Sequence, residues 1–373
     1  MRIAVAGMRG FPGIQGGVET HGEMLYPRIS RLGCEVTVMR RRPFVHETPP
    51  LTSWQGVRFR DLDAPARMGV EALVHTLRSV WAARRMRADI IHIHAIGPSL
   101  AVPFARLLGL KVVVTHHGPD YDRLKWGAFA RLLLRTGERC AARQADAIIV
   151  ISTVIRDILK TKYGRTRGVH LIYNGVRKAV RATSTRCVRE LGLTPGNYVL
   201  AVGRFVEEKN FDRLVAAFAS AARPDGCRLV IAGAADHATA YSARLTALAE
   251  LHDVVLAGMV KGKALSELYS HARLFVLPSS HEGLPFTLLE AMSFGRDVLV
   301  SDIAANRAVN LPAECYFHYS DDPVPALREA LADRLSRPAA PRAYDLSPYD
   351  WDTIAEQTLA VYREVLGDST FTI

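Results

Sequence analysis

Two glutamates in the second half of the chain have the spacing and the setting of a ligand site. Glu282 and Glu290 lie in the segment Ser279–Met292, which reads SSHEGLPFTLLEAM. An apolar run precedes this segment, Gly283 permits a tight turn, and Pro285 suits the first turn of a helix. Because carboxylates accept hydrogen bonds from hydroxyl groups, two of them can hold two parts of one polyhydroxyl ligand. Free backbone N–H groups at the start of the helix add donors beside three residues of the turn: Gly283, Leu284 and Phe286.

Two cations follow another apolar run, Tyr198–Val202. Arg204 and Lys209 stand within one turn of each other. A guanidinium and an ammonium at the end of a strand can neutralise a diphosphate group as it departs. The adjacent Glu207 and Glu208 leave the alternative that both cations are simply solvated.

A glycine-rich turn, RGFPGIQGGVET from Arg9 to Thr20, follows the first apolar run of the chain. Gly16 and Gly17 stand where a helix begins, and backbone N–H groups there can approach a phosphate at the positive end of the helix dipole. Many strand-to-helix turns are rich in glycine for steric reasons, and that alternative remains.

Histidines end two further apolar runs, as His92 and His94 and as His116 and His117. Two such pairs at neighbouring strand ends raise the question of a metal site. However, no carboxylate or cysteine lies at ligand spacing beside them, and strand alternation turns His92 into the core. We therefore predict no metal, and expect His94 or His117 to line a polar pocket.

Runs rich in Val and Ile alternate with segments of helical period, which favours α/β architecture with doubly wound parallel sheets. The predicted strands are Ile3–Ala6, Glu35–Arg40, Asp89–His94, Lys111–Thr115, Ala147–Ile151, His170–Tyr173, Tyr198–Val202, Arg228–Ala232, Val254–Ala257, Leu274–Pro278 and Asp297–Ser301. Ligands of such sheets bind beyond the carboxyl ends of the strands, where the polar residues named above stand.

The length of 373 residues favours two domains. The alternating pattern lapses between Gly175 and Asn197, and again in the Pro-rich stretch that precedes a last amphipathic helix. We predict an N-terminal Rossmann-like domain of residues 1–178 that is completed by residues 350–373. Residues 190–348 are expected to form a C-terminal Rossmann-like domain, with a ligand cleft between the two.

Charge is distributed unevenly along the chain. Residues 1–180 contain 29 Lys and Arg against 13 Asp and Glu, a net charge of +16, while the remainder carries −5. A basic first half indicates an anionic partner, either a nucleic acid or a membrane surface, unless the arginines are merely solvated. We find no apolar run long enough to span a bilayer. Five widely spaced cysteines predict reduced thiols in a cytoplasmic protein.

Taken together, these segments resemble the retaining GT-B glycosyltransferases of the large bacterial class that builds capsules, exopolysaccharides and lipopolysaccharide cores. The resemblance covers nearly the whole chain and rests on GGVETH at 16–21, THHG at 115–118, NGV at 174–176, Gly203-Arg204 with Lys209, the E-x7-E motif from Glu282 to Glu290, and Trp351-Asp352 with Tyr362. It implies two Rossmann-like domains that face a central cleft, and a last helix that crosses back to the first domain. Asp297 departs from the proline usual in relatives, at a position we expect at the back of the donor pocket.

The resemblance implies a role for each motif residue. Gly16 and Gly17 would approach the donor phosphates, and His117 would contact the donor sugar or its diphosphate. Arg204 and Lys209 would bind the diphosphate, Glu282 the transferred sugar and Glu290 the ribose. Gly283, Leu284 and Phe286 would complete the donor site, with His94 and Glu19 on the acceptor side. The leaving phosphate would take the acceptor proton, so neither metal nor cofactor is expected.

The same resemblance implies a UDP-, GDP- or dTDP-linked sugar as donor and a polyprenyl-diphosphate-linked saccharide as acceptor, in exopolysaccharide, capsule or O-antigen assembly. The basic half adds the expectation of a cytoplasmic protein bound peripherally to the inner face of the cell membrane. Two candidate amphipathic helices support it, one with Leu73, Val74, Leu77, Val80 and Trp81 and the other with Trp126, Phe129 and Leu133.

Three alternatives remain. Gly7, Gly10 and Gly13 with Arg40–Arg42 mimic an NADP-binding fingerprint, and Tyr121 with Lys125 mimics a reductase pair, as in a nucleotide-sugar epimerase or reductase. The pairs Asp61/Asp63 and Asp120/Asp122 could be a metal motif of single-domain transferases. A nucleic-acid-binding module would use the basic half, but the chain lacks interleaved aromatic residues and we expect no nucleic acid.

Overall fold

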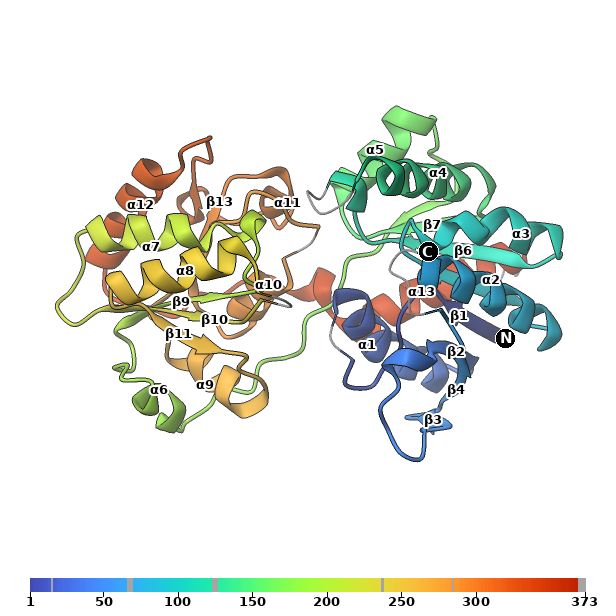
Figure 1. Cartoon of the computed structure of the whole chain (residues 1–373), viewed down its shortest axis with the longest axis horizontal. Coiled ribbons are helices and arrows are strands. Elements are labelled where there is room, and N and C mark those ends of the chain that lie inside the picture. Colours follow the sequence, from blue (N-terminus) through green and yellow to red (C-terminus); the bar gives the residue numbers. More distant parts are fainter. Residues whose placement is uncertain (15, 66–69, 123–126, 236–237, 284, 368–373) are drawn as a thin grey trace. The chain divides into compact units, whose positions relative to one another are not determined.

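The computed structural model describes residues 1–14, 16–65, 70–122, 127–235, 238–283 and 285–367. They form two compact units (Figure 1), each described here by itself. Unit 1 comprises Met1–Gly175 and Pro348–Ile373, and unit 2 comprises Val176–Ser347. The predicted fold class is confirmed, because each unit is a mainly parallel sheet flanked by helices.

Unit 1 is built on an eight-stranded sheet of order β3-β4-β2-β1-β5-β6-β7-β8. Its strands are β1 (Arg2–Ala6), β2 (Glu35–Arg41), β3 (Ser53–Trp54), β4 (Val57–Leu62), β5 (Ile90–His94), β6 (Lys111–His116), β7 (Ala147–Val150) and β8 (Val169–Leu171). All described pairings are parallel except β3 with β4. Strands β3 and β4 were not predicted, because β3 has two residues and β4 (VRFRDL) alternates apolar and charged side chains near the edge of the sheet.

Helices cover both faces of this sheet. They are α1 (Gly17–Arg31), α2 (Val70–Arg85), α3 (Val102–Leu107), α4 (Ala128–Gln144), α5 (Thr153–Tyr163) and α13 (Trp351–Leu366). Helices α2 to α5 contact one another in succession, whereas α13 packs against α1. The last helix therefore returns to the first unit, as expected. Its buried residues Ile354, Leu359 and Tyr362 join a core with Ile3, Val5 and Val36 of the sheet.

Trp351, the first residue of α13, is seated on a glycine. A Cβ at Gly175 would lie 2.6 Å from Cε2 of the indole ring, closer than real Cβ atoms approach another heavy atom. Asp350 begins the helix as its N-cap and accepts hydrogen bonds from the backbone N–H groups of Asp352 and Thr353. The NGV segment at 174–176 is thus explained in part by the space that Trp351 requires.

Unit 2 contains a six-stranded parallel sheet of order β11-β10-β9-β12-β13-β14. Its strands are β9 (Tyr198–Val202), β10 (Arg228–Ala232), β11 (Val255–Gly258), β12 (Leu274–Leu277), β13 (Asp297–Ser301) and β14 (Tyr316–Phe317). The five predicted strands are present, with β11 shifted by one residue. The short β14 was not predicted, since two residues give no periodic signal.

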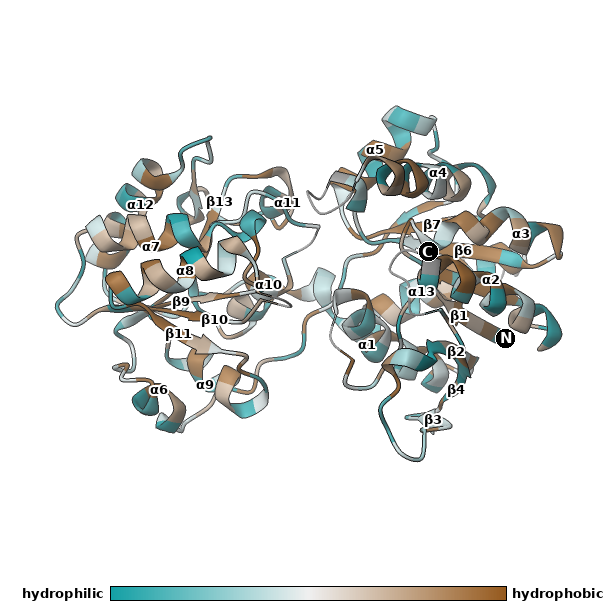
Figure 2. Cartoon of the chain, viewed as in Figure 1, coloured by the Kyte–Doolittle hydropathy of each residue, from teal (hydrophilic) through white to brown (hydrophobic). Residues whose placement is uncertain are grey.

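The helices of unit 2 are α6 (Arg186–Glu190), α7 (Phe211–Ser220), α8 (Ala240–Leu251), α9 (Gly262–His271), α10 (Phe286–Ser293), α11 (Ala304–Arg307) and α12 (Val324–Ser336). Helix α7 contacts α8 and α12 on one face, and α6 contacts α9. Brown, hydrophobic strands run between helices that carry both brown and teal residues (Figure 2), and the buried apolar side chains of strands and helices form one core. Helix α6 belongs to this unit, although it begins before the residue 190 predicted for the domain.

Asp297 stands at the amino end of β13, opposite the strand ends where ligands of such sheets bind. Its carboxylate forms ion pairs with Arg334 of α12 and with Nε of Arg342, the latter at 2.7 Å. Because the Arg334 side chain is buried, the carboxylate neutralises a charge that the apolar surroundings would otherwise destabilise. The structure gives Asp297 this packing role at the strand ends opposite those that Arg204 and Glu282 follow, not at the back of the expected donor site.

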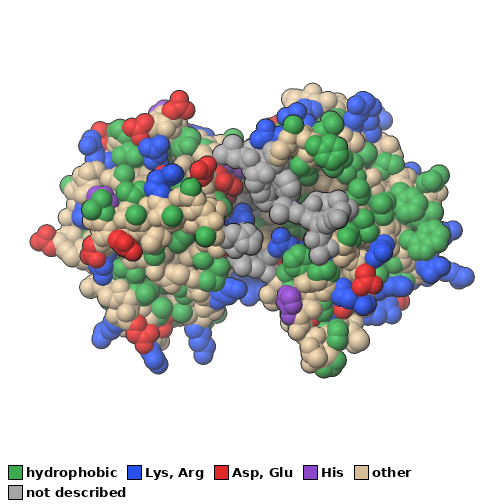
Figure 3. All heavy atoms as spheres, in the orientation of Figure 1, with side chains coloured by type: hydrophobic (Ala, Val, Ile, Leu, Met, Phe, Trp, Pro, Cys, Tyr) green, Lys and Arg blue, Asp and Glu red, His purple; other side chains and the backbone are tan. Residues whose placement is uncertain are grey.

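The surface of unit 1 combines exposed apolar and basic side chains (Figure 3). Phe129 of α4 is 73% exposed and Trp81 of α2 is 49% exposed. Val80, which we predicted on the same apolar face as Trp81, is instead fully buried. Trp126 lies outside the described residues. Within the described residues, no helix is both long enough and apolar enough to cross a membrane.

We predict that Gly175→Ala destabilises the protein to urea by about 1–3 kcal/mol, because the new methyl group displaces the Trp351 ring. The control is a double-mutant cycle with Trp351→Leu. In that background the same Gly175→Ala substitution should cost close to nothing, since the ring that it strikes has been removed. Equal costs in both backgrounds would contradict the packing described above.

Candidate active site

In each unit the candidate residues follow the strands at which the sheet order reverses. In unit 1 the chain moves outward from β1 in one direction and from β5 in the other, and in unit 2 the same reversal falls between β9 and β12. At such a switch point the loops after two neighbouring strands diverge and leave a crevice for a ligand. The glycine-rich turn follows β1 and His94 ends β5, while Arg204 follows β9 and Glu282 follows β12.

The loops after β9 and β12 are tied together by hydrogen bonds. Nδ2 of Asn210 donates to the carbonyl of Pro278 at 3.1 Å, and the N–H of Ser280 donates to the carbonyl of Glu208 at 2.9 Å. Asn210 adopts the left-handed conformation, with φ of 51°, between the short 3-10 helix Glu207–Lys209 and α7. These bonds fix Lys209 against the loop that carries Glu282.

Lys209 and Glu282 form a close ion pair. Nζ of Lys209 donates to Oε1 of Glu282 at 2.5 Å, and Oγ of Ser279 donates to the same oxygen at 2.7 Å. The two charged side chains are only 15% and 11% exposed. Charges held in a partly desolvated site act more strongly on a ligand than charges in bulk water. The pair was not predicted from the sequence, although both of its members were expected at the site.

Glu290 lies four residues into α10, which begins at Phe286, with Pro285 as its N-cap rather than in its first turn. Oη of Tyr269 donates to Oε2 of Glu290 at 3.0 Å. Burial raises the pKa of the Glu290 carboxyl, although the hydrogen bond from Tyr269 and the charge of Arg177 act in the opposite direction. A ligand that donates hydroxyl hydrogen bonds would stabilise the ionised carboxylate. Leu284 lies outside the described residues.

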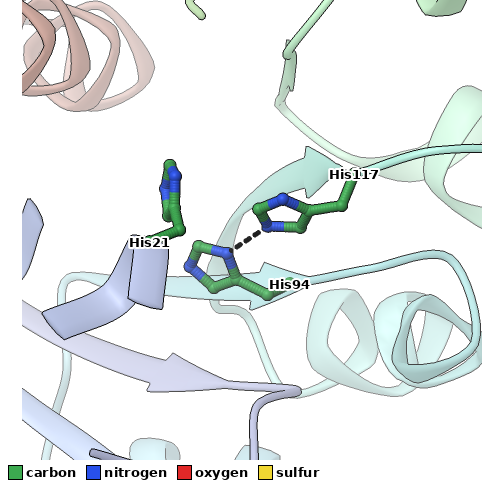
Figure 4. A group of neighbouring side chains, drawn as sticks. All are labelled: His21, His94 and His117. Carbon is green, nitrogen blue, oxygen red and sulfur yellow. Dashed lines mark hydrogen bonds between the residues drawn. The ribbon is translucent and has the colours of Figure 1, made fainter. Parts of the chain in front are cut away.

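Three histidines gather at the strand ends of unit 1 (Figure 4). His94 ends β5, His117 follows β6, and His21 projects from the first turns of α1. One nitrogen of each ring lies within 4.8 Å of a nitrogen of each other ring, and Nδ1 of His94 is hydrogen-bonded to Nε2 of His117 at 2.9 Å. We expected no carboxylate or cysteine at ligand spacing beside His94 and His117, and the third potential ligand is instead a histidine from α1. His21 belongs to the GGVETH segment, but no role was predicted for it from the sequence.

A chain of buried hydrogen bonds leads to this cluster from the last helix. Oη of Tyr362 contacts Nδ1 of His92 at 2.6 Å, and Oη of Tyr26 contacts the same nitrogen at 3.0 Å. Tyr26 is also bonded to Nε2 of His94. Nε2 of His92 contacts Oγ1 of Thr115 at 2.7 Å. His92 points into the core as predicted, and there it connects α13 and α1 to the strand ends.

Burial keeps the rings of this cluster uncharged. It lowers the pKa of His21 to about 4 and that of His92 to about 3, and it holds the pKa values of His94 and His117 well below the usual range of histidine. Each neighbouring ring that could become protonated lowers these values further. At neutral pH the imidazoles therefore act as neutral donors and acceptors.

The glycine-rich turn is held by Glu19. Oε1 of this buried carboxylate accepts a hydrogen bond from the N–H of Arg9 at 3.0 Å. Gly16 has φ of 152°, and a Cβ there would strike the other carboxylate oxygen, so glycine is needed. Gly17 is the first residue of α1. Glu19, expected on the acceptor side, thus shapes the turn that presents the helix N-terminus.

The residues of the NADP alternative have other partners. Arg40 is fully buried, its Nε donates to Asp61 at 2.7 Å, and Arg41 is paired with Glu71. Neither guanidinium of β2 is therefore free for a nucleotide phosphate. Tyr121 is buried and donates to Glu138, while Lys125 and the side chain of Asp122 lie outside the described residues. Asp61 is committed to Arg40 rather than placed to bind a metal.

Comparison with known proteins adds independent information. Residues 15–179 match Glycosyltransferase Family 4, and residues 189–347 match the glycosyl transferases group 1. The chain is 27% identical to the alpha-maltose-1-phosphate synthase of Mycolicibacterium smegmatis, over 98% of this chain and 100% of that protein. It is 28% identical to the GDP-mannose:cellobiosyl-diphosphopolyprenol alpha-mannosyltransferase of Xanthomonas oryzae pv. oryzae, over 75% of each.

A similar fold is known from a solved structure. The sucrose-phosphate synthase from Thermosynechococcus elongatus superimposes with a TM-score of 0.83, at 22% identity, over 99% of this chain and all of that one. At this identity the likeness supports the fold: two Rossmann-like domains with a returning last helix.

Proposed function

From the matches to Glycosyltransferase Family 4 and to the glycosyl transferases group 1, we propose that the chain is a glycosyltransferase, and specifically a retaining hexosyl or deoxyhexosyl transferase. The donor is a nucleotide sugar held by unit 2, and the acceptor is a lipid-linked saccharide that meets unit 1. The observation that carries the proposal is the Lys209–Glu282 pair at the β9/β12 switch point. The ammonium can bind a diphosphate, while the neighbouring carboxylate accepts hydrogen bonds from the hydroxyls of the attached sugar.

The donor is proposed to lie along the strand ends of unit 2. Lys209 and Arg204 bind the diphosphate, and Glu282 accepts hydrogen bonds from hydroxyls of the sugar. Glu290 accepts them from the ribose, helped by Tyr269, which donates to one of its oxygens. A loop and the first turn of α10 separate Glu282 from Glu290 along the chain. The two carboxylates can therefore bind two different parts of one nucleotide sugar.

In the proposed reaction, the bond between the anomeric carbon and the diphosphate oxygen breaks, and the acceptor oxygen bonds to the same carbon from the same face. The departing diphosphate takes the acceptor proton, so the protein supplies no base. Arg204 and Lys209 stabilise the negative charge that builds up on the diphosphate. His117, whose ring is neutral at physiological pH, contacts the sugar or its diphosphate.

The lipid-linked acceptor is supported by the Xanthomonas relative, whose name specifies a diphosphopolyprenol substrate. The Mycolicibacterium relative makes a sugar phosphate, which is the alternative of a soluble acceptor. The net charge of +16 in residues 1–180, together with exposed Trp81 and Phe129, favours the membrane surface. We therefore propose a cytoplasmic enzyme adsorbed to the inner leaflet, with no cofactor and no nucleic-acid partner.

We predict that Glu282→Gln and Lys209→Met each reduce kcat roughly 10²-fold or more, because a fixed contact to the reacting sugar or diphosphate is lost. The matched controls are the exposed Glu250→Gln and Lys263→Met of the same unit, which should keep full activity. Turnover is measured with a panel of nucleotide sugars, including donor hydrolysis. Near-normal rates in folded variants of both site residues would show that the site is elsewhere.

Glu290 should act on nucleotide affinity. Glu290→Gln is predicted to weaken binding of the preferred nucleoside diphosphate about 10- to 100-fold, because a charge-assisted hydrogen bond is lost. Because burial raises the pKa of Glu290, the carboxylate is lost at a higher pH than usual for glutamate. Wild-type affinity for the nucleotide should therefore fall as pH drops through that raised pKa. The affinity of the variant should depend less on pH. Calorimetry across pH 5–8 measures both, and identical wild-type and variant curves would refute the ribose assignment.

Activity should persist in excess EDTA, since the proposed charge stabilisation at the diphosphate comes from Arg204 and Lys209. The measurement is sugar transfer after dialysis against chelator, with and without added magnesium or manganese. Complete loss with EDTA, restored by either ion, would revive a metal-dependent mechanism.

Reversible binding to anionic vesicles is the fourth expectation for this function, measured by co-sedimentation at low and high salt. Each cation near the surface contributes about 1 kcal/mol, screened by salt. Arg84→Glu/Arg85→Glu on α2 should weaken binding strongly. Arg213→Glu/Arg328→Glu on unit 2 changes the net charge equally and should have little effect. Equal binding to neutral and anionic vesicles, or none to either, would favour a soluble acceptor.

A further inference from the structure

Hydrogen bonds among the three imidazoles at the strand ends of unit 1 do not satisfy all of their ring nitrogens. His94 and His117 bond to each other, but Nε2 of His21 is buried and has no hydrogen-bond partner among the residues that the structure describes. A buried polar atom without a partner is costly, and such atoms are few in native proteins. We propose that His21, His94 and His117 form a binding site for one divalent transition-metal ion of the zinc type.

The partners of His21 make its Nε2 a ligand. Its Nδ1 lies 2.6 Å from Oδ1 of Asn174, and a carbonyl oxygen can only accept, so the proton is on Nδ1. Nε2 then carries a lone pair. The Trp351 ring packs edge-on against the imidazole, with centroids 5.5 Å apart, and restricts its rotation. A histidine whose second nitrogen donates to an amide carbonyl is the arrangement found around metal-ligating histidines.

The hydrogen bond with Tyr26 likewise determines which nitrogen of His94 carries the proton. A proton on Nε2 of His94, donated to Oη of Tyr26, leaves the lone pair on Nδ1, the nitrogen that faces His117. Tyr26 in turn can donate to Nδ1 of His92. Two of the three inward nitrogens thus carry lone pairs when their outer hydrogen bonds are satisfied.

The distances suit a first-row ion after small side-chain movements. Ligand nitrogens at about 2.0–2.1 Å from a tetrahedral zinc lie about 3.3 Å apart. Nδ1 of His94 and Nε2 of His117 are now 2.9 Å apart, and each of the three rings has a nitrogen within 4.8 Å of a nitrogen of the other two. The ion would separate the first pair slightly and draw His21 inward. The proton between His94 and His117 would then move to the outer nitrogen of His117.

The chemistry of the ligands selects the ion. Three neutral imidazoles suit Zn²⁺, Co²⁺, Ni²⁺ or Cu²⁺, whereas Mg²⁺ and Ca²⁺ require oxygen ligands. His117 is the most accessible of the three rings, so a water or anion can complete the coordination on its side.

Such an ion would regulate the enzyme and would not serve as a cofactor. This step rests on the proposed function, in which His117 contacts the donor sugar or its diphosphate. A metal bound to Nε2 of His117 moves the ring proton to the outer nitrogen and changes that nitrogen from an acceptor to a donor, so zinc should inhibit transfer and chelator should relieve the inhibition. Metal binding itself depends only on the geometry of unit 1 and can be measured without substrate.

The test is titration of the full-length, tag-free chain with Co²⁺, followed by its visible d–d absorption, and with Zn²⁺ as competitor. We expect one equivalent to bind with a spectrum that lacks thiolate charge transfer, and Mg²⁺ not to displace it. His21→Gln should weaken Co²⁺ binding about 100-fold or more, and Asn174→Ala about 10-fold. The exposed His46→Gln is the matched control and should bind as the wild type does.

Circular dichroism and nucleotide binding by unit 2 verify that each variant is folded. Absence of saturable Co²⁺ binding, or binding that His21→Gln leaves unchanged, would overturn the site. The activity measurement is separate: stoichiometric binding without inhibition of transfer would leave the metal site in place and refute the role of His117 in the proposed function.

Discussion

Buried imidazole rings can be kept in unit 1 only if they remain uncharged, and this constraint organises its strand ends. Moving an isolated charge into a protein interior costs several kcal/mol, so burial lowers the pKa values of His21, His92 and His94 far below neutrality. A neutral ring still has one donor and one acceptor to satisfy. Tyr362, Tyr26 and Asn174 supply most of the partners, and each comes from a different segment. The orientation of His117 therefore depends on residues spread from α1 to α13.

Unit 2 meets the same requirement for polar groups in the opposite way, by keeping charges and pairing them. Lys209 and Glu282 neutralise each other in a partly buried setting, with Ser279 as a third partner. Asp297 does the same for Arg334 at the other end of the sheet. An ion pair between two loops can exchange its partners for those of a ligand, the ammonium for a diphosphate and the carboxylate for hydroxyl donors. Neutral, fixed rings and exchangeable charges are complementary means for handling a sugar and a diphosphate.

Much of this arrangement could be predicted from the sequence, because it follows from local patterns. Runs of Val and Ile mark the central strands, and the rule that ligands bind beyond strand ends singled out Arg204, Glu282 and His94. Strand β4, which lies between β2 and the edge strand β3, escaped prediction because charged residues interrupt its apolar positions. The Lys209–Glu282 pair joins residues 73 positions apart, and no spacing rule reports such a contact.

His21 shows a different limit of sequence reading. It belongs to a helix rather than to a strand end, so its approach to His117 depends on how α1 crosses the sheet. The position of a helix over a sheet is set by the packing of many side chains, among them Tyr26 and Phe11 in the core. Strand ends can be listed from periodicity, whereas a side chain that reaches them from a helix can be found only once the packing is known.

The division of unit 1 between the two ends of the chain has a consequence for biosynthesis. The ribosome makes residues 1–175, then all of unit 2, and only afterwards Trp351 and the rest of α13. At 5–20 residues per second, the interval between Gly175 and Pro348 is on the order of 10 to 30 s. During that time α1 and its histidine lack their cover, while unit 2 can complete its fold. Nascent unit 1 is therefore the part of the chain most exposed to chaperones and proteases.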